Sequence, residues 1–474
     1  MKNSSRAFGT LITIFFFWGF VAASNDILIP VFKKALNLSQ LKSQMISFAF
    51  YVAYTVGSLL YFGISAFLKQ DILNKLGYRN GLSLGLVISA LGTLLFIPAS
   101  NTASFGLLIS GLFIVGLGFS LQQIAANPLA IQMGDPTKGN IRLSLAGGIN
   151  NVGTTIGPVI VAFAIFGSSQ AGEQTLNLEA VQTPYIVLGI AFLLAALLFK
   201  FSNVPDKLSQ EDKQEFSVNA MLAVMKKPQV ILGMLAIFIY VGVEVSTASN
   251  LPEFMKQKLN FKEQNIAPYV SLFWASLMIG RWTSAAGAFT SNKQLKMILG
   301  ILLPFVAFGI FLFVNSFSGT DLSIFYPYLG LIVVLILADF LSMGSPSKQL
   351  IYYSALGIIS LLIGMFATGM VSVFAFIAVG LFCSTLWPCI FTLSIAGLGA
   401  KTNTASSLLI MMIMGGGFIS TAQGALADTN LGIQNSYWVG VACFAYLIYF
   451  AIQTTALLKK EGVSIDNSSA STGH

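Results

Sequence analysis

The sequence predicts an all-α polytopic membrane protein with two six-helix bundles and an inserted helix pair, about 14 transmembrane helices in all. Three observations predict this. The 474 residues are 55% hydrophobic and only 9% charged, with a mean hydropathy of +0.81, whereas a soluble domain carries about 25% charged residues. Apolar runs of membrane-spanning length recur along the chain, and one long polar stretch, 200–217, divides them.

The apolar runs are predicted to be helices. About 20 apolar residues in a helix cross the roughly 30 Å of hydrocarbon, and lipid offers no partner for open backbone groups. The first series of spans is 8–31, 44–68, 81–98, 105–130, 142–167 and 184–201. The second series is 230–251, 267–290, 295–316, 324–343, 349–366, 370–396, 404–425 and 435–457.

An internal repeat accounts for the six-plus-eight arrangement. "FAFYVAYTVG" in the second span resembles "LFWASLMIGR" in the eighth at an offset of about 223, but Pro128 and Pro388 differ by 260. The growing offset indicates that two helices, near 295–343, are inserted into a second copy of the first half. Repeated halves are typical of transporters, whose site lies near the membrane midplane.

These observations define four regions. We expect an N-terminal six-helix bundle (1–201), a cytoplasmic linker (202–228), a C-terminal bundle with the inserted hairpin (229–460) and a disordered cytoplasmic tail (461–474). With the N-terminus inside, 19 Lys and Arg residues lie on the inner side and 6 on the outer side. This asymmetry predicts that both termini are cytoplasmic. A cleavable signal is the alternative for the first segment, because "VAAS" resembles a cleavage site, but the apolar run continues beyond it.

Three acidic residues lie within predicted spans, where a charge costs about 2.5–3.5 kcal/mol and usually serves a function. Asp26 and Glu244 lie deep, at equivalent places of the two halves, and are expected to face one central cavity. They are candidates for cation coupling, and a sodium ion near Asp26 is one possibility. Asp339 lies near an inner end and is expected to be interfacial. A structural hydrogen bond to a neighbouring helix is the alternative role for Asp26 and Glu244.

Amide and aromatic side chains occur in the same spans and suit a sugar, because amides pair with hydroxyl groups and a Trp ring can cover a pyranose. The candidate substrate-binding residues are Asn25, Gln123, Asn127, Asn150, Asn151, Asn250, Trp274, Trp387 and Gln423. For each Trp, packing or a place at the membrane interface is the alternative reading.

The remaining composition argues against an enzyme. The one histidine is the terminal His474, and the three cysteines lie in apolar runs, so no triad, metal site or disulfide is expected. We expect no cofactor apart from a coupling ion, sodium or proton. The net charge of +8 reflects Lys and Arg in cytoplasmic loops, so no nucleic-acid partner is expected.

Several stretches resemble one family. "FFFWGFVAASNDILIPVF", "LQQIAANP", "IRLSLAGGINNVGTTIGP", "IYVGVEVSTASNLPEF", "WPCIFTLSIAGLG" and "GGGFISTAQGALAD" resemble the fucose:proton symporter family of the major facilitator superfamily, and most closely its glucose/galactose transporter branch. The resemblance covers nearly all of the chain except 295–343. It implies the major facilitator fold, hexose uptake by alternating access and a key carboxylate at Asp26.

The chain departs from the fucose symporters at Gln123, where that family carries a second key Glu. Gln cannot titrate, so a two-carboxylate proton mechanism is in doubt and sodium or proton stays open. The glucose/galactose branch shares this Gln and has "GAEV" where this chain has "GVEV" with Glu244.

The sequence therefore predicts a cation-coupled hexose symporter, a monomer in the bacterial inner membrane whose partners are a sugar and the lipid bilayer. The alternatives are a 14-span drug/proton exporter and a non-transporting sugar sensor on the same fold.

Overall fold

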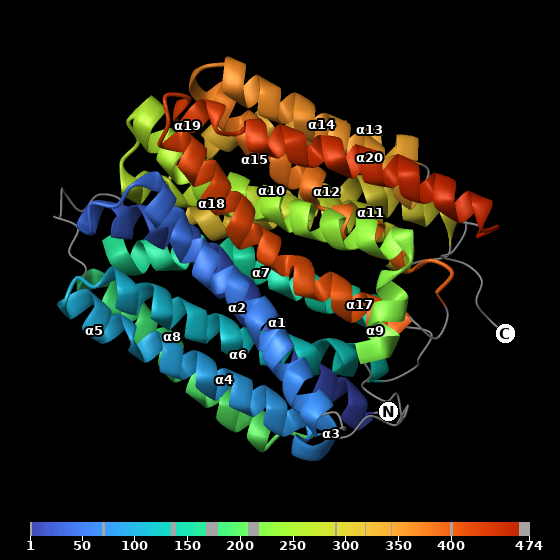
Figure 1. Cartoon of the computed structure of the whole chain (residues 1–474). Helices are drawn as coiled ribbons and strands as arrows, with labels where there is room; N and C mark the ends of the chain where they lie inside the picture. Colours follow the sequence, from blue (N-terminus) through green and yellow to red (C-terminus); the bar gives the residue numbers. More distant parts are fainter. Residues whose placement is uncertain are drawn as a thin grey trace. The chain divides into compact units, whose positions relative to one another are not determined.

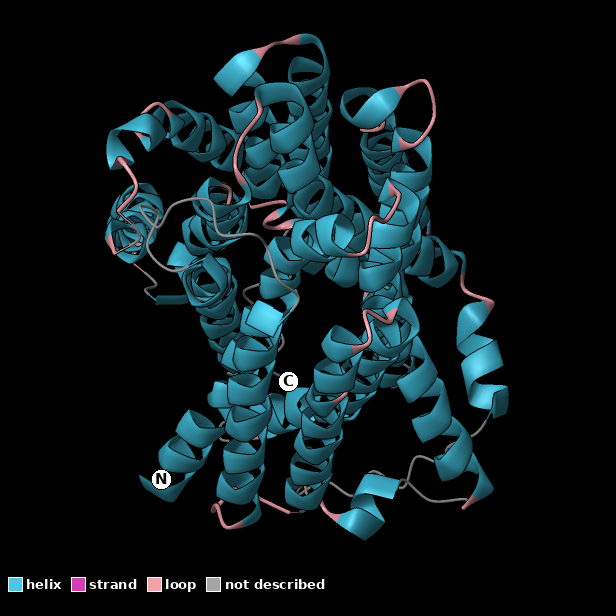
Figure 2. Cartoon of the chain, turned by 90° about the vertical axis from the view of Figure 1, so that its left-hand side faces the viewer, coloured by secondary structure: helices cyan, strands magenta, loops and turns pink. Residues whose placement is uncertain are grey.

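The computed structural model describes residues 2–68, 72–133, 139–166, 179–206, 218–289, 292–317, 319–342, 344–398 and 402–463. Over these residues the chain is helical with short loops and contains no strand (Figure 2). Thirteen helices there are long and apolar enough to cross a membrane. The eighth predicted span, 267–290, corresponds to the helix Ala267–Phe289 of 23 residues. This helix is not among those thirteen.

The chain divides into two compact units, Met1–Val218 and Asn219–His474 (Figure 1). Unit 1 contains α1 (Lys2–Ala35), α2 (Gln40–Phe67), α3 (Ile72–Leu76), α4 (Tyr78–Leu94), α5 (Phe96–Asn101), α6 (Phe105–Gln132), α7 (Gly139–Phe166) and α8 (Glu179–Lys200). Unit 2 contains α9 (Val218–Met225), α10 (Pro228–Leu259), α11 (Ala267–Phe289), α12 (Lys293–Ser316), α13 (Tyr328–Ser342), α14 (Pro346–Phe366), α15 (Gly369–Cys383), α16 (Leu386–Ile395), α17 (Thr402–Met411), α18 (Gly415–Ala427), α19 (Gly432–Asn435) and α20 (Trp438–Lys460). Short 3₁₀ turns lie at Glu263–Asn265, Leu322–Phe325 and Met412–Met414.

Polar side chains start several of these helices. Ser39 Oγ accepts from the backbone N–H of Lys42 at the start of α2, and Ser104 Oγ accepts from Leu107 at the start of α6. Asn292 accepts from two backbone N–H groups of α12. Each side chain satisfies a donor that the first helical turn leaves open.

The two units share one packing order once α12 and α13 are set aside. In unit 1, α1 packs on α7, α2 on α6, and α4 on both α6 and α8. In unit 2, α10 packs on α18, α11 on α15, and α14 on both α15 and α20. These are the corresponding helices of an internal repeat, and the extra pair lies after the second helix of unit 2, as the offsets predict.

Buried polar contacts fix the inserted pair to the rest of unit 2. Asn315 of α12 donates to Ser271 Oγ of α11 (3.2 Å), and Tyr328 of α13 shares a 2.6 Å hydrogen bond with Ser276. Asp339 is half-buried and accepts from Gln349 Nε2 of α14 at 2.9 Å. Asp339 therefore joins α13 to α14, a contact that the sequence did not predict.

The predicted linker, 202–228, contains a short helix. The eight-residue helix α9 packs Val224 into an apolar cluster with Val230 and Leu408. This helix is much shorter than a membrane span, so the search for spans did not predict it. Residues 207–217 of the linker and 464–474 of the predicted disordered tail lie outside the described residues.

Several predicted spans differ in detail. The span 230–251 continues through Pro252 to Leu259 as α10. Two other spans, 370–396 and 404–425, are interrupted, the first at 384–385 and the second by the 3₁₀ turn at 412–414. Discontinuous helices are typical of the binding regions of transporters.

Glycines set the distance between α1 and α7. A Cβ added to Gly19 would lie 2.0 Å from the backbone oxygen of Asn150, and one added to Gly153 would lie 2.3 Å from that of Phe16. Small residues let membrane helices approach this closely. We therefore expect a methyl group at Gly19 to force the two helices apart.

We predict that Gly19→Ala destabilises unit 1 by about 1–3 kcal/mol, the usual cost of overpacking. The control is Gly9→Ala in the same helix, where an added Cβ meets nothing within 4 Å. Thermal unfolding of the detergent-solubilised protein should show a lower midpoint for the first variant alone. Equal midpoints for both variants would contradict the close packing.

Candidate functional site

In unit 1, Asp26 lies in α1 with 3% of its surface exposed. Pro30 follows one helical turn later inside the same helix. Because proline has no N–H, it cannot complete the helical hydrogen bond to the carbonyl of the residue four positions earlier, which is Asp26. Residue 26 therefore offers a carboxylate and a backbone carbonyl released from the helix. Carbonyls of this kind coordinate sodium ions or protons in transporters with broken helices.

The next residues to consider are Asn150 and Asn151 of α7. Asn150 Nδ2 donates to the backbone oxygen of Phe15 in α1 at 3.0 Å. Asn151 is 2% exposed, and its carbonyl accepts from Thr154 and Thr155 in its own helix. The contact of Asn150 holds α1 against α7, so a sugar-binding role for this pair stays a prediction.

Neighbouring amides on α6 have different environments. Gln122 is fully buried, accepts from Trp18 Nε1 of α1 and donates to Ser89 Oγ of α4, both at 3.1 Å. Gln123 and Asn127 are half-buried and lie one turn apart on the same face of the helix. Gln122 therefore joins three helices, whereas Gln123 and Asn127 keep part of their surface for a ligand.

Unit 2 brings Glu244 together with Tyr240 of its own helix and with residues from two other helices. Tyr240, one turn earlier on α10, donates to Glu244 Oε2. The Tyr240 ring packs on the half-buried Trp387 of α16, with ring centroids 6.2 Å apart. Arg281 of α11 lies close enough to Glu244 to interact with it electrostatically. The carboxylate, its cation and an aromatic surface thus form one cluster.

The break between α15 and α16 positions Arg281. Pro388 cannot donate to the carbonyl of Ser384, four residues earlier. Instead, Arg281 Nε donates to that carbonyl at 3.1 Å. The guanidinium therefore satisfies a backbone oxygen that lipid could not satisfy, and the same contact fixes its charge beside Glu244.

The remaining candidates are more deeply buried. Asn250 is fully buried and donates to the backbone oxygen of Ser246 at 2.8 Å, and Trp274 is 4% exposed. Gln423 is fully buried and donates to Ser436 Oγ at 3.3 Å, while its Oε1 atom is buried without a hydrogen-bond partner. Their surroundings favour packing and helix contacts, and a role in binding stays a prediction. Asn25 lies in α1, but its side chain is outside the described part.

Three residues were not predicted from the sequence: Arg281 and Tyr240 of the Glu244 cluster, and Glu253 further along α10. Arg281 is one of the 19 Lys and Arg residues that the charge asymmetry places on the inner side, yet it lies half-buried within α11. Its signal was a charge inside the apolar run "LFWASLMIGRW". Tyr240 could have been found from its spacing of four residues from Glu244. Glu253 was left outside the seventh span, but α10 continues past Pro252 and buries it to 6% exposure.

No group of three or more His, Cys, Asp or Glu side chains within the described residues could hold a metal ion. The oxygen atoms at residue 26 could hold a transported cation. Each unit carries an acidic residue on its first long helix: the buried Asp26 on α1 and the half-buried Glu244 on α10.

Comparisons with known proteins place the chain among transporters. The family model described as "Major Facilitator Superfamily" matches residues 7–351. A glucose/galactose transporter of Brucella abortus is 30% identical over 455 residues, which cover 95% of this chain and 94% of that protein. The L-fucose-proton symporter of Escherichia coli is 28% identical, with coverages of 94% and 92%.

A solved structure is also similar. The crystal structure of the E. coli fucose:proton symporter, FucP, matches with a TM-score of 0.62 and 25% identity, and covers 95% of this chain and 99% of that one. Together these findings confirm the predicted fold class and the resemblance stated from the sequence motifs.

The contrast between the neighbouring glutamines yields a prediction. We expect Gln122→Leu to destabilise the protein by about 1–3 kcal/mol, because Trp18 Nε1 and Ser89 Oγ lose their buried partner. Gln123→Leu should unfold near the wild-type temperature, because that side chain is half-buried. Thermal unfolding of both variants in detergent checks this. An equal loss of stability in both would show that the two amides are not distinguished as described.

Proposed function

The chain belongs to the Major Facilitator Superfamily, and we propose that it takes up a hexose by symport with sodium or protons. Its relatives named a glucose/galactose transporter and an L-fucose-proton symporter support a sugar as the substrate. The observation that carries the proposal is the acidic residue on the first long helix of each unit, buried Asp26 and half-buried Glu244, combined with these relatives. A bacterial inner membrane with both termini cytoplasmic is part of the same proposal.

We assign coupling to Asp26. Its carboxylate and the backbone carbonyl that Pro30 releases supply oxygen atoms at one level of α1. A proton or a sodium ion can be held by such atoms, and a charge at a buried position of a membrane span is costly. Binding of the cation would therefore favour the conformational change that carries the bound cation across the membrane. The unloaded carboxylate would oppose that change.

Glu244 is assigned to sugar binding. Arg281 offsets part of the electrostatic cost of placing the Glu244 charge in the helix bundle, and the carboxylate oxygens can accept from sugar hydroxyls. Hydrogen bonds to a charged group are the stronger ones. Trp387 provides an aromatic face next to it through Tyr240. In unit 1, the half-buried amides Gln123 and Asn127 are separate candidates for sugar binding.

The alternatives have less support. A 14-span drug/proton exporter would carry its two extra helices between the six-helix halves, but α12 and α13 lie inside unit 2. A non-transporting sugar sensor would bind hexose without moving a cation. Hexose uptake by proteoliposomes, with sodium and proton gradients imposed separately, distinguishes the symporter, the exporter and the sensor. If neither gradient drives accumulation of hexose, symport is refuted.

For Asp26→Asn we predict loss of gradient-driven accumulation with hexose exchange retained, because the amide can neither carry a proton nor neutralise sodium. Asp428→Asn, an exposed aspartate at the end of α18, is the control and should accumulate hexose normally. Counterflow and accumulation are measured on the same proteoliposomes. Full accumulation by Asp26→Asn would exclude the coupling role.

For Glu244→Gln we predict weaker hexose binding by about 10- to 150-fold, because a hydrogen bond to a charged acceptor contributes about 1.5–3 kcal/mol. The exposed Glu461→Gln, which loses only a surface ion pair with Lys227, should bind normally. Titration calorimetry with glucose, galactose and fucose checks both variants. Unchanged affinity for each bound hexose in Glu244→Gln would remove Glu244 from the sugar site.

A further inference from the structure

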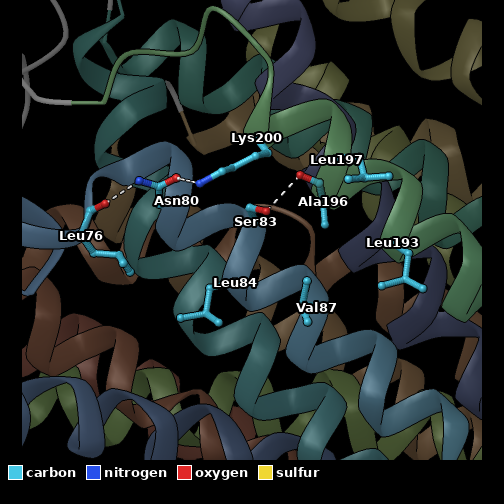
Figure 3. A pocket seen from close by; sticks show the side chains of 9 residues that line it. All are labelled: Leu76, Asn80, Ser83, Leu84, Val87, Leu193, Ala196, Leu197 and Lys200. Carbon is cyan, nitrogen blue, oxygen red and sulfur yellow. Dashed lines mark hydrogen bonds between the residues drawn. The ribbon is translucent and has the colours of Figure 1, made fainter.

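A groove of about 670 Å³ lies between α4 and α8 of unit 1 (Figure 3). The two helices are joined across it by Ser83 Oγ, which donates to the backbone oxygen of Ala196 at 3.0 Å. The groove is separate from the residues assigned to sugar and cation binding, because none of those residues lines it. Its ligand must therefore be sought in its own chemistry.

One end of the groove is cationic. Lys200 Nζ donates to Asn80 Oδ1 at 2.8 Å, and Asn80 in turn donates to the backbone oxygen of Leu76 (Figure 3). Asn80 is a neutral amide, so this contact positions the ammonium group without neutralising it, and no carboxylate of the described residues forms a salt bridge with Lys200. The exposed Lys75 on α3 adds a second positive charge beside Leu76. Arg79 nearby is neutralised by Asp206 at 2.9 Å.

The other end is apolar. Leu84, Leu193 and Leu197 are 44%, 45% and 55% exposed, and Val87 lies among them (Figure 3). From Asn80 to Val87 the helix rises about 10 Å, which is about a third of the hydrocarbon thickness. Both helices are membrane-spanning in length and composition. The groove therefore runs from a positively charged helix end into the apolar layer.

We propose that this groove binds an anionic phospholipid, with the phosphate at Lys200 and the first part of an acyl chain along Leu84, Val87 and Leu193. Basic pockets between membrane helices hold anionic headgroups in this way. Asn80 fixes Lys200 at the mouth and can itself donate to a phosphate or glycerol oxygen. A zwitterionic lipid would fit the apolar part equally well, but it offers no net negative charge to the lysine.

The test is native mass spectrometry of the full-length protein, titrated with phosphatidylglycerol and with phosphatidylcholine of the same acyl chains. Phosphatidylglycerol should bind at least about fivefold more tightly, which corresponds to about 1 kcal/mol for one lysine near an anionic surface. Lys200→Gln should abolish that preference. The control Lys226→Gln, an exposed lysine of unit 2 that does not line the groove, should keep it.

A third variant tests the apolar half. Val87→Phe fills the groove and should weaken the binding of phosphatidylglycerol. A second ligand, glycerol 1-phosphate, has no acyl chain and should bind the unmodified protein far more weakly than the lipid does. The proposal is overturned if both lipids bind unmodified protein equally, or if Lys200→Gln keeps the preference. It is also overturned if glycerol 1-phosphate binds as tightly as the lipid, which would indicate a site for free phosphate.

Discussion

Every backbone hydrogen bond of a membrane helix must be made within the protein, because hydrocarbon supplies no donor or acceptor. Proline prevents such a bond at two places that matter here. Pro30 releases the carbonyl of Asp26, and Pro388 releases that of Ser384. One released carbonyl lies on the residue assigned to the coupling ion, and the other holds Arg281.

The two units use the same helical arrangement for different electrostatics. In unit 2 an arginine lies near the half-buried Glu244, and a helix break fixes that arginine. In unit 1 the equivalent helix carries Asp26 with a released carbonyl on the same residue. Gln122, which contacts the same helix at Trp18, joins three helices. This difference supports a division of labour between coupling and sugar binding.

The inserted helices α12 and α13 show how a repeat can acquire extra spans without losing its packing. They are held by Asn315, Tyr328 and Asp339, each bonded to a helix of the common arrangement. Such polar contacts between membrane helices contribute about 0.6 kcal/mol on average, and up to about 1–2 kcal/mol. The insertion therefore belongs to the body of unit 2, and the pairings α11–α15 and α14–α20 remain as in unit 1.

The fold was predictable because composition, span length and repeat offsets are all properties of the sequence that do not depend on which helices pack together. The helix partners were not, since a spacing of four residues does not tell which face of α6 meets α1. Gln122 and Gln123 differ for that reason. The position of Arg281 was not predicted because its carbonyl partner exists only where α15 breaks, more than 100 residues away. The burial of Glu253 was not predicted because the predicted span ends just before Pro252. The short helix α9 was not predicted because it is much shorter than a membrane span.

The claim that hexose and cation move together is tested most directly by sugar-driven cation flux. Proteoliposomes without any cation gradient receive a hexose gradient, while internal pH and tracer sodium are followed at the same time. Symport predicts that the hexose gradient moves one of the two cations inward with the sugar. Hexose entering at the same rate with neither cation moving would contradict it.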